Sequence, residues 1–461
     1  MLSLFDTRRT RRAAMLQIGS LASTGLGLNH LLAADRDAHA SLSGRSVILL
    51  FLHGGPSQIE TFDPKMDAPA EIRSATGEVA TSIPGIKFGG TFPGLAQRAD
   101  KLAIVRSFTT GDGNHDIKPV VSRHSMGASI GSIYSRVAGS TDTASGLPSN
   151  VTLFPRAVDP ERQPAQLSFG RFDATGPLGK AYSPFVPGTG GPLQENMKLS
   201  LASDRLDDRR ALLTQLDRLK SSVDATGTLD GMDHFRQQAF NTILGGAADA
   251  FDLSREPQDL IRRYDTAPLL KPDQISRRWN NYNNYVDNVM TLGKLMLMAR
   301  RLVERGCGFV TVTTNFVWDM HADVNNATME EGMRYMGHPL DHALSAFIDD
   351  IESRGLSDRV LLVCCGEMGR TPRINAAGGR DHWGGLAPLL FYGGGTNCGA
   401  VTGQSTKDAA SPLSEPWGIN HLLATIFHSV FDVGKLRLDR SLPTDLVRLI
   451  TSHEPIDGVL A

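Results

Sequence analysis

Five apolar runs, separated by polar segments, predict the strands of a buried sheet. The first run, residues 46–53, is apolar almost throughout and is followed by Gly54-Gly55-Pro56. A strand covered on both faces reads as a continuous apolar run, whereas a half-exposed strand alternates. The same pattern predicts four further strands, over residues 102–106, 309–313, 359–365 and 388–392.

Helices are predicted between these runs, where apolar residues recur three or four positions apart. The pattern over residues 279–305 ends at Gly306 and the pattern over 340–354 ends at Gly355, and glycine suits a helix C-terminus. A third helix is predicted over 417–431. Strands and helices that alternate in this way predict an α/β fold, a doubly wound, mainly parallel sheet with helices on both faces.

The chain is expected to hold one large domain behind an export signal. Four arginines precede a mildly apolar stretch at residues 15–32, and the segment from Thr10 to Leu16 resembles a twin-arginine export signal. We therefore expect residues 1–40 to direct export to the periplasm or cell envelope, although an amphipathic basic N-terminus is the alternative. Polar residues interrupt the apolar stretch, so no permanent membrane span is expected.

The domain is expected to cover residues 41–461, with a helical or irregular insertion at about 150–280 that does not follow the strand–helix alternation. Lysine and arginine total 47 against 49 acidic residues, for a formal net charge of −2. Nucleic acid is therefore not expected as a partner, because phosphate binding normally requires a basic excess. Four cysteines cannot form a dense disulfide framework, so the fold must be held by packing.

Polar residues that could carry chemistry cluster near the ends of the predicted strands, where ligands gather in open α/β sheets. They are His53, His115, Asp319, His321, Glu367, Arg370, Asp381 and His382. Asp319 and His321 are two residues apart, so in an extended segment both would point to one side and could bind a cation. Carboxylate with imidazole suits Zn²⁺ or Mn²⁺, and all-oxygen sets suit Mg²⁺ or Ca²⁺. Arg370 could hold two oxygens of an anion or pair with Glu367.

Six motifs together resemble an exported bacterial family that is abundant in planctomycetes. They are residues 51–65 (Phe-Leu-His-Gly-Gly-Pro-Ser-Gln-Ile-Glu-Thr-Phe-Asp-Pro-Lys), Arg106-Ser107, Asn114-His115, Trp318-Asp-Met-His321, Gly366-Glu-Met-Gly-Arg-Thr-Pro372 and Gly379-Arg-Asp-His-Trp383. The family is catalogued as domain-of-unknown-function family fifteen-hundred-and-one, in the alkaline phosphatase/sulfatase superfamily. The resemblance runs from about residue 46 to the C-terminus.

This resemblance implies a sheet whose strand ends hold one or two divalent cations and a covalent nucleophile. Asp319 and His321 look like ligands of one metal, joined by His382 beside Asp381. Glu367 and His53 would complete a second or shared site. The nucleophile region falls at residues 109–116, where the prominent residue is His115, with Thr109 and Thr110 as fallback nucleophiles. The expected protein is an exported metal-dependent hydrolase of phosphate or sulfate esters, acting on a small-molecule or polysaccharide ester.

Two alternatives remain open. Gly127-Ala128-Ser129-Ile130-Gly131 fits the nucleophile turn of serine esterases, with Asp358 or Asp381 and His382 or His421 completing a triad. Only two valines precede this motif, however, which makes a poor buried strand. The third hypothesis is a non-catalytic envelope or binding protein on the same fold, favoured by the lack of a first-strand aspartate and of an obvious serine or cysteine nucleophile.

Overall fold

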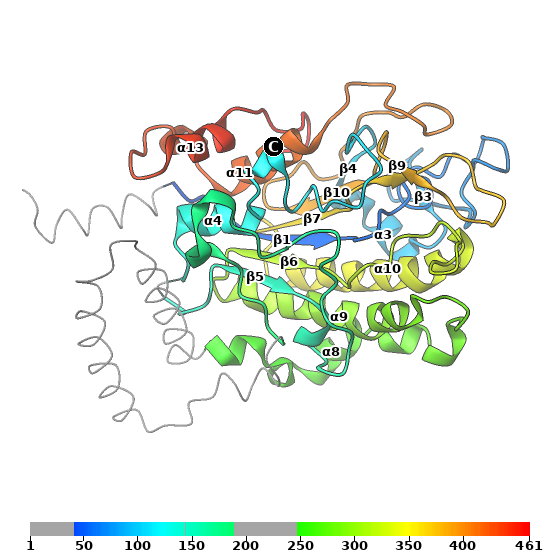
Figure 1. Ribbon diagram of the computed structural model, residues 1–461, viewed down its shortest axis with the longest axis horizontal. Helices are drawn as coiled ribbons and strands as arrows, with labels where there is room; N and C mark the ends of the chain where they lie inside the picture. The colour runs from blue at the N-terminus through cyan, green and yellow to red at the C-terminus, as the bar shows by residue number, and fades with distance from the viewer. Residues whose placement is uncertain (1–40, 143, 189–246) are drawn as a thin grey trace, which may run out of the picture.

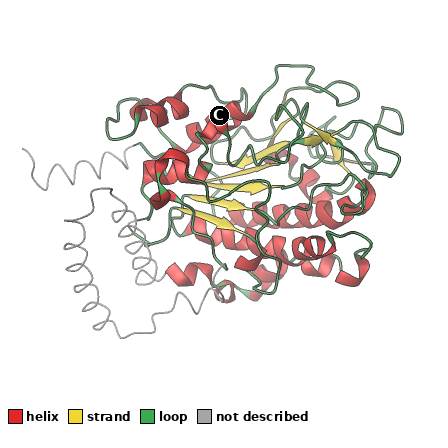
Figure 2. Ribbon diagram, viewed as in Figure 1, coloured by secondary structure: helices red, strands yellow, loops and turns green. Residues whose placement is uncertain are grey.

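The computed structural model describes residues 41–142, 144–188 and 247–461. The expected export segment and the middle of the expected insertion lie outside the described residues. The centre of the fold is a seven-stranded sheet in the order β11-β4-β10-β7-β1-β6-β5 (Figures 1 and 2). Five of these strands confirm the predictions from the apolar runs: β1 (Ser46–Phe51), β4 (Leu102–Val105), β6 (Phe309–Val312), β7 (Val360–Cys365) and β10 (Leu389–Gly393).

The sequence did not indicate the two edge strands, β5 (Asn150–Leu153) and β11 (Val401–Thr402). β5 pairs with β6 and so belongs to the central sheet, although it lies at the start of the stretch expected to be an insertion. Its four residues alternate polar and apolar, which is too short a pattern to separate from a loop. β11 contributes only two residues, paired with β4.

Strand direction explains where the ends of the elements meet. β10 runs antiparallel to both β4 and β7, and the other neighbouring pairs are parallel, which confirms a mainly parallel sheet. Residues that precede β10 therefore lie at the same edge of the sheet as residues that follow β1, β4, β6 and β7. Two short hairpins lie outside the main sheet: β2 (Glu78–Ala80) with β3 (Lys87–Gly89), and β8 (Gly369–Arg370) with β9 (His382–Trp383).

Helices cover both faces of the sheet, as predicted (Figure 2). One layer contains α3 (Pro93–Gln97), α8 (Gln258–Tyr264), α9 (Tyr282–Glu304) and α10 (Met329–Ser353). The other contains α4 (Ile130–Ala138), α11 (Ile419–Val430), α12 (Val433–Leu436) and α13 (Thr444–Thr451). Ile48 and Leu50 of β1 join the first core and Val47 and Leu49 join the second. Because both faces are buried, the strand has no polar face.

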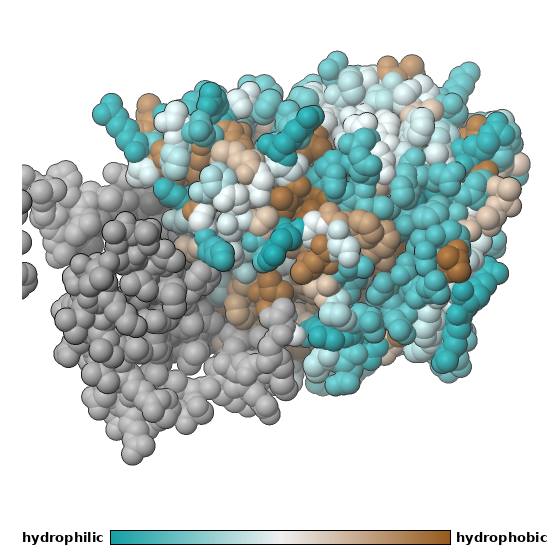
Figure 3. Space-filling model, in the orientation of Figure 1, coloured by the Kyte–Doolittle hydropathy of each residue, from teal (hydrophilic) through white to brown (hydrophobic). Residues whose placement is uncertain are grey.

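Short 3₁₀ helices occupy the connecting segments. They span Ala99–Lys101, Arg123–Ser125, Pro155–Ala157, Gly176–Leu178, Lys180–Tyr182, Ala247–Phe251, Leu253–Arg255, Ala267–Leu269 and Pro272–Gln274. On the face seen in Figure 3, hydrophilic residues predominate on the right-hand side, where α10 and β3 lie in Figure 1. None of the described helices combines the length and the apolar character that crossing a membrane requires.

α10 begins eleven residues before the predicted start at residue 340, because Pro339 does not end it. A proline inside a helix leaves the carbonyl four residues earlier without its usual N–H donor. Here that carbonyl belongs to Tyr335, and the buried side chain of Asn288 in α9 donates to it over 3.1 Å. A neighbouring helix thus replaces the missing hydrogen bond. The helix begins instead at Thr328, whose hydroxyl accepts from the Glu331 N–H.

Candidate metal centre

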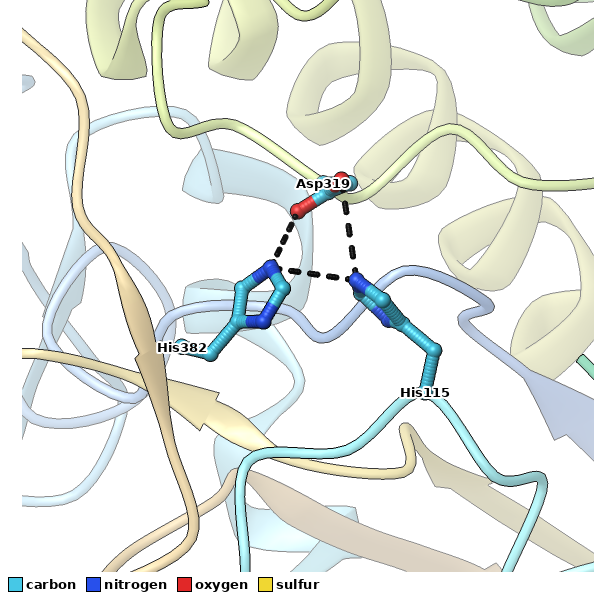
Figure 4. A group of neighbouring side chains, drawn as sticks. All are labelled: His115, Asp319 and His382. Carbon is cyan, nitrogen blue, oxygen red and sulfur yellow. Dashed lines mark hydrogen bonds and ion pairs between the residues drawn. The ribbon is translucent and has the colours of Figure 1, made fainter.

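Three side chains from distant parts of the chain converge at the carboxyl edge of the sheet (Figure 4). His115 follows β4, Asp319 follows β6, and His382 lies in β9, before the antiparallel β10. His382 Nε2 lies 3.1 Å from His115 Nε2 and 3.1 Å from Asp319 Oδ1. His115 Nε2 lies 3.6 Å from Asp319 Oδ2. The sheet topology therefore brings two imidazoles and one carboxylate together.

These spacings fit a metal ion. Donor atoms bound to Zn²⁺ at about 2.0–2.1 Å in a tetrahedral arrangement lie about 3.3 Å from one another. The two separations of 3.1 Å from His382 Nε2, to His115 Nε2 and to Asp319 Oδ1, lie close to that value, and His115 Nε2 lies 3.6 Å from the other oxygen of Asp319, Oδ2. Three protein ligands with a fourth position open is the pattern of catalytic rather than structural zinc sites. Two imidazole nitrogens and a carboxylate also suit Mn²⁺ better than Ca²⁺, which prefers oxygen.

Glu367 lies behind His115 and orients its ring. The carboxylate is fully buried in the loop after β7, and its Oε1 lies 2.9 Å from His115 Nδ1. The Gly54 N–H donates to the same oxygen over 2.9 Å. A carboxylate at this distance favours the tautomer of His115 with its proton on Nδ1, which leaves Nε2 on the side of Asp319 and His382. Glu367 was expected to be a metal ligand, and the structure instead gives it the supporting position of a carboxylate–histidine pair.

Asp319 is held in one orientation by three donors. Arg370 Nη2 donates to its Oδ1 over 2.7 Å, His321 Nδ1 donates to the same oxygen over 2.7 Å, and the Asn326 amide donates to Oδ2 over 3.1 Å. Burial alone would raise the pKa of Asp319, but Arg370 and the hydrogen bonds hold that pKa well below its usual range. The carboxylate is therefore ionised and available to a cation.

His321 is not among the three donors that converge, so its expected role as a ligand stays a prediction. Its Nδ1 bonds Asp319 and its Nε2 lies 3.3 Å from Asp323 Oδ2. The hydrogen bond to Asp319 raises the pKa of His321, against the effect of burial. Both ring nitrogens of His321 already have a carboxylate partner. The spacing of Asp319 and His321 thus marked a hydrogen-bonded pair.

Arg370 is a positioning residue rather than the expected anion clamp. Its side chain is fully buried, and its guanidinium also donates to the carbonyls of Gly54, Gly55 and Arg380. The ion-pair partner of Arg370 is Asp319, and not Glu367 as the sequence also suggested. Because every branch of the guanidinium has a partner inside the protein, Arg370 links the β1, β6 and β7 loops and meets no solvent.

His53 is buried among aromatic rings instead of joining the donor atoms. Phe51, Phe169, Phe172 and Phe316 surround its ring at centroid distances of 5.0–5.9 Å. Burial lowers the pKa of His53 from 6.5 to about 4, so the ring is neutral at pH 7. Its backbone carbonyl accepts from the N–H groups of Val317 and Trp318. His53 therefore supports the loop that carries Asp319.

The remaining expected residues lie outside the three-residue cluster. Asp381 is exposed, and its carboxylate accepts from the Asn375 amide over 3.0 Å. The Thr110 hydroxyl has one weak contact, with the Asp112 carbonyl at 3.5 Å. Its expected role as a nucleophile stays a prediction.

Ser129 caps α4, and its hydroxyl lies 2.8 Å from that of Ser132. Its φ of −67° is relaxed, and the strained turn that exposes an esterase nucleophile is missing at this position. His421 Nδ1 instead accepts from the Gly418 N–H at the start of α11. The structure therefore gives Ser129 a capping role and no contact with either proposed histidine.

Two groups near the centre were not found from the sequence. Arg380 and Glu60 form a fully buried ion pair at 2.9 Å, and Arg380 also donates to the carbonyls of Ile72 and Arg73. Arg380 lies two residues before His382, so this pair fixes the loop that delivers the ligand. The rings of Phe169 and Phe316 stack at 4.5 Å, and both contact His115. Arg380 could have been singled out because it lies in the Gly-Arg-Asp-His-Trp motif, whereas the sequence around Phe169 contains no motif that points to the site.

Fold and site together define an α/β protein with a candidate metal centre at the carboxyl edge of its sheet. The chain belongs to the family described as a protein of unknown function (DUF1501), whose model matches residues 44–435. This confirms the family that the motifs resemble. No curated protein matches the sequence.

Three of the solved structures that are similar to the chain come from bacteria. The lipoteichoic acid synthase LtaP from Listeria monocytogenes is 7% identical, with 86% of this chain and 76% of that chain covered and a TM-score of 0.31. The PsFucS1 sulfatase from Pseudoalteromonas sp. is 12% identical, with 92% of this chain and 74% of that chain covered and a TM-score of 0.32. The phosphonate monoester hydrolase SpPMH from Silicibacter pomeroyi is 10% identical, with 89% of this chain and 77% of that chain covered and a TM-score of 0.33.

Proposed function

We propose that the protein is an exported, metal-dependent hydrolase of phosphate or sulfate esters. The observation that carries the proposal is the convergence of His115, Asp319 and His382 at the spacing of metal ligands. The ester class comes from the superfamily that the sequence motifs resemble. Export is proposed from the twin-arginine pattern at Arg11-Arg12, which lies outside the described residues.

A divalent cation in this position would lower the pKa of a coordinated water and offset negative charge on a phosphoryl or sulfuryl group. The chain's own residues prepare the ligands. Glu367 keeps the proton of His115 on Nδ1, and Arg370 keeps Asp319 ionised. Arg380 and Glu60 hold the loop that carries His382. Each ligand is therefore oriented by a buried partner or by a buried loop contact, which is the design of a pre-organised site.

A specific observation supports a second candidate, a metal-binding protein without catalysis. Among the described residues, no serine, threonine or cysteine side chain hydrogen-bonds to His115, Asp319 or His382. A covalent nucleophile would have to lie within reach of the reacting phosphorus or sulfur. Hydrolysis by direct attack of water remains compatible with the three-ligand arrangement.

The test is hydrolysis of 4-nitrophenyl phosphate and 4-nitrophenyl sulfate by the full chain, first treated with a chelator and then given one equivalent of Zn²⁺ or Mn²⁺. We expect turnover of one ester only with metal, and a loss of more than about 100-fold in His382→Ala, because losing a ligand should exceed the 10–100-fold effect of losing a supporting residue. His453→Ala, an exposed histidine, is the matched control. Metal binding without turnover of either ester would establish the second candidate instead.

A further inference from the structure

A cavity of about 670 Å³ shares a wall with the candidate metal centre. The segment that carries His115 lines one side through Asp116, and Phe169 and Arg123 line other parts. The Phe169 ring also contacts the His115 ring at a centroid distance of 5.1 Å. Sites for small ligands commonly enclose about 300–1,000 Å³. The cavity therefore has the size and position to receive the part of a substrate that extends away from the metal.

The charges around the cavity nearly balance. Two ion pairs neutralise most of them, Lys118 with Asp112 and Arg171 with Asp173. Asp116 and Arg123 also line the cavity, and neither forms an ion pair with another described residue. Arg123 Nε instead donates to His124 Nε2 over 3.3 Å, and burial lowers the pKa of that histidine. Asp116 and Arg123 are both exposed, so their charged groups are accessible to an occupant of the cavity.

A carboxylate and a guanidinium on the wall of one cavity suit a neutral occupant that carries hydroxyl groups. Because Asp116 and Arg123 carry opposite charges, together they give the cavity no net attraction for a strongly anionic or a strongly cationic group. Hydroxyl groups can donate to the carboxylate of Asp116 and accept from the guanidinium of Arg123. Phe169 adds an apolar aromatic surface of the kind on which the C–H face of a sugar ring can lie.

We infer that this cavity binds the alcohol part of the ester and that this part is a neutral polyhydroxylated alcohol such as a sugar. The inference rests on the proposed function, because it assigns the alcohol half of the same ester. Asp116 and Arg123 then act as specificity-determining residues. The phosphoryl or sulfuryl group faces the metal centre beyond Phe169 and His115.

Two measurements on the full chain separate this inference from the proposed function. The first is saturation-transfer NMR with the methyl glycosides of glucose, galactose and mannose. We expect transfer to at least one glycoside, reduced about fivefold or more in Asp116→Asn and Arg123→Gln. The second compares kcat/KM for a hexose 6-ester and the phenyl ester of the same acid. The ratio of hexose to phenyl ester should fall about tenfold in both variants, the loss of about 1.4 kcal/mol of selective binding.

The control is Arg373→Gln, an exposed arginine paired with Glu71 outside the cavity, in which the NMR signal and the ratio should not change. Transfer to a glycoside that is lost in both variants, without turnover of any ester, would overturn the proposed function and leave the sugar-binding cavity standing. Turnover without glycoside transfer, or a ratio unchanged in both variants, would overturn the cavity assignment and leave the hydrolase standing.

Discussion

The Glu367 carboxylate lies 2.9 Å from His115 Nδ1, on the side of the imidazole ring opposite the atom that faces Asp319 and His382. One buried acid therefore decides which nitrogen of His115 is free. A ring with its proton fixed on Nδ1 presents Nε2 as a ligand, and the added basicity strengthens a metal bond. This arrangement places His115, which was expected to act as a nucleophile, among the donors of the candidate metal centre.

Glu367→Gln should weaken metal binding by about 10–100-fold, because the amide keeps an acceptor but loses the charge that makes His115 basic. Isothermal titration with Zn²⁺ measures the change. Glu71→Gln, a partly exposed acid on another loop that pairs with Arg373, is the control and should bind zinc as the wild type does. Equal affinities in wild type and Glu367→Gln would show that the Glu367–His115 contact has no part in holding the ion.

Arg370→Met should lower the free energy of unfolding by about 3–5 kcal/mol, since it leaves the buried Asp319 without its cation and the carbonyls of Gly54, Gly55, Trp318 and Arg380 without their donor. Urea unfolding of the metal-free protein checks this. Arg373→Met changes an exposed arginine three residues away and should stay within about 0.5 kcal/mol of wild type. A loss below about 1 kcal/mol in Arg370→Met would mean that Asp319 finds another counter-charge.

Gly54→Ala should disturb both stability and metal binding. Gly54 has a φ of +116°, and a Cβ there would lie 2.5 Å from the Asp319 backbone nitrogen. The methyl group would push the Asp319 loop away from His115 and His382. Gly44→Ala is the matched control, with a φ of +78° and open space around the added carbon.

Both glycine substitutions should cost about 1–2 kcal/mol from the backbone conformation alone. Only Gly54→Ala should lose more than this in urea unfolding, together with most of its zinc affinity. If the two variants behaved alike in both measurements, close packing of the first-strand loop against Asp319 would not matter for the site.

Acid should destabilise the fold through His53. The pKa is about 4 in the folded protein and 6.5 for the model imidazole, so between these values the unfolded chain binds a proton that the folded protein does not. The free energy of unfolding should fall by about 3 kcal/mol from this residue as the pH drops from 6.5 to 4. His53→Phe should reduce that dependence by the same amount in urea unfolding, and His453→Phe should not. An unchanged pH dependence in His53→Phe would remove His53 as its source.

The sequence predicted the fold well where local pattern and topology agree. Buried strands such as β1 are recognisable because both faces are apolar, and the carboxyl ends of parallel strands locate His115 and Asp319. The helix start at Met329 was missed because Pro339 ends most helices, and only the tertiary contact with Asn288 makes the exception possible.

The individual roles in the site could not be predicted, because they depend on which atom faces which partner. His321 and His382 are both histidines near Asp319, yet one bonds two carboxylates and the other meets His115. Arg370 lies in a glycine-rich motif that reads as an exposed loop, and its burial follows only from three-dimensional packing. Positions along the chain predicted which residues lie near the strand ends, and the fold shows which three of them, His115, Asp319 and His382, converge as candidate ligands.

The most direct test is the metal content of the full chain, purified without chelators and dialysed, measured by elemental analysis beside His382→Ala and His321→Gln. The wild type should hold about one equivalent of Zn²⁺ or Mn²⁺, His321→Gln should retain most of it, and His382→Ala should retain almost none. A wild-type protein that holds no metal after incubation with either ion, or a His382→Ala variant that holds as much as wild type, would contradict a metal centre formed by His115, Asp319 and His382.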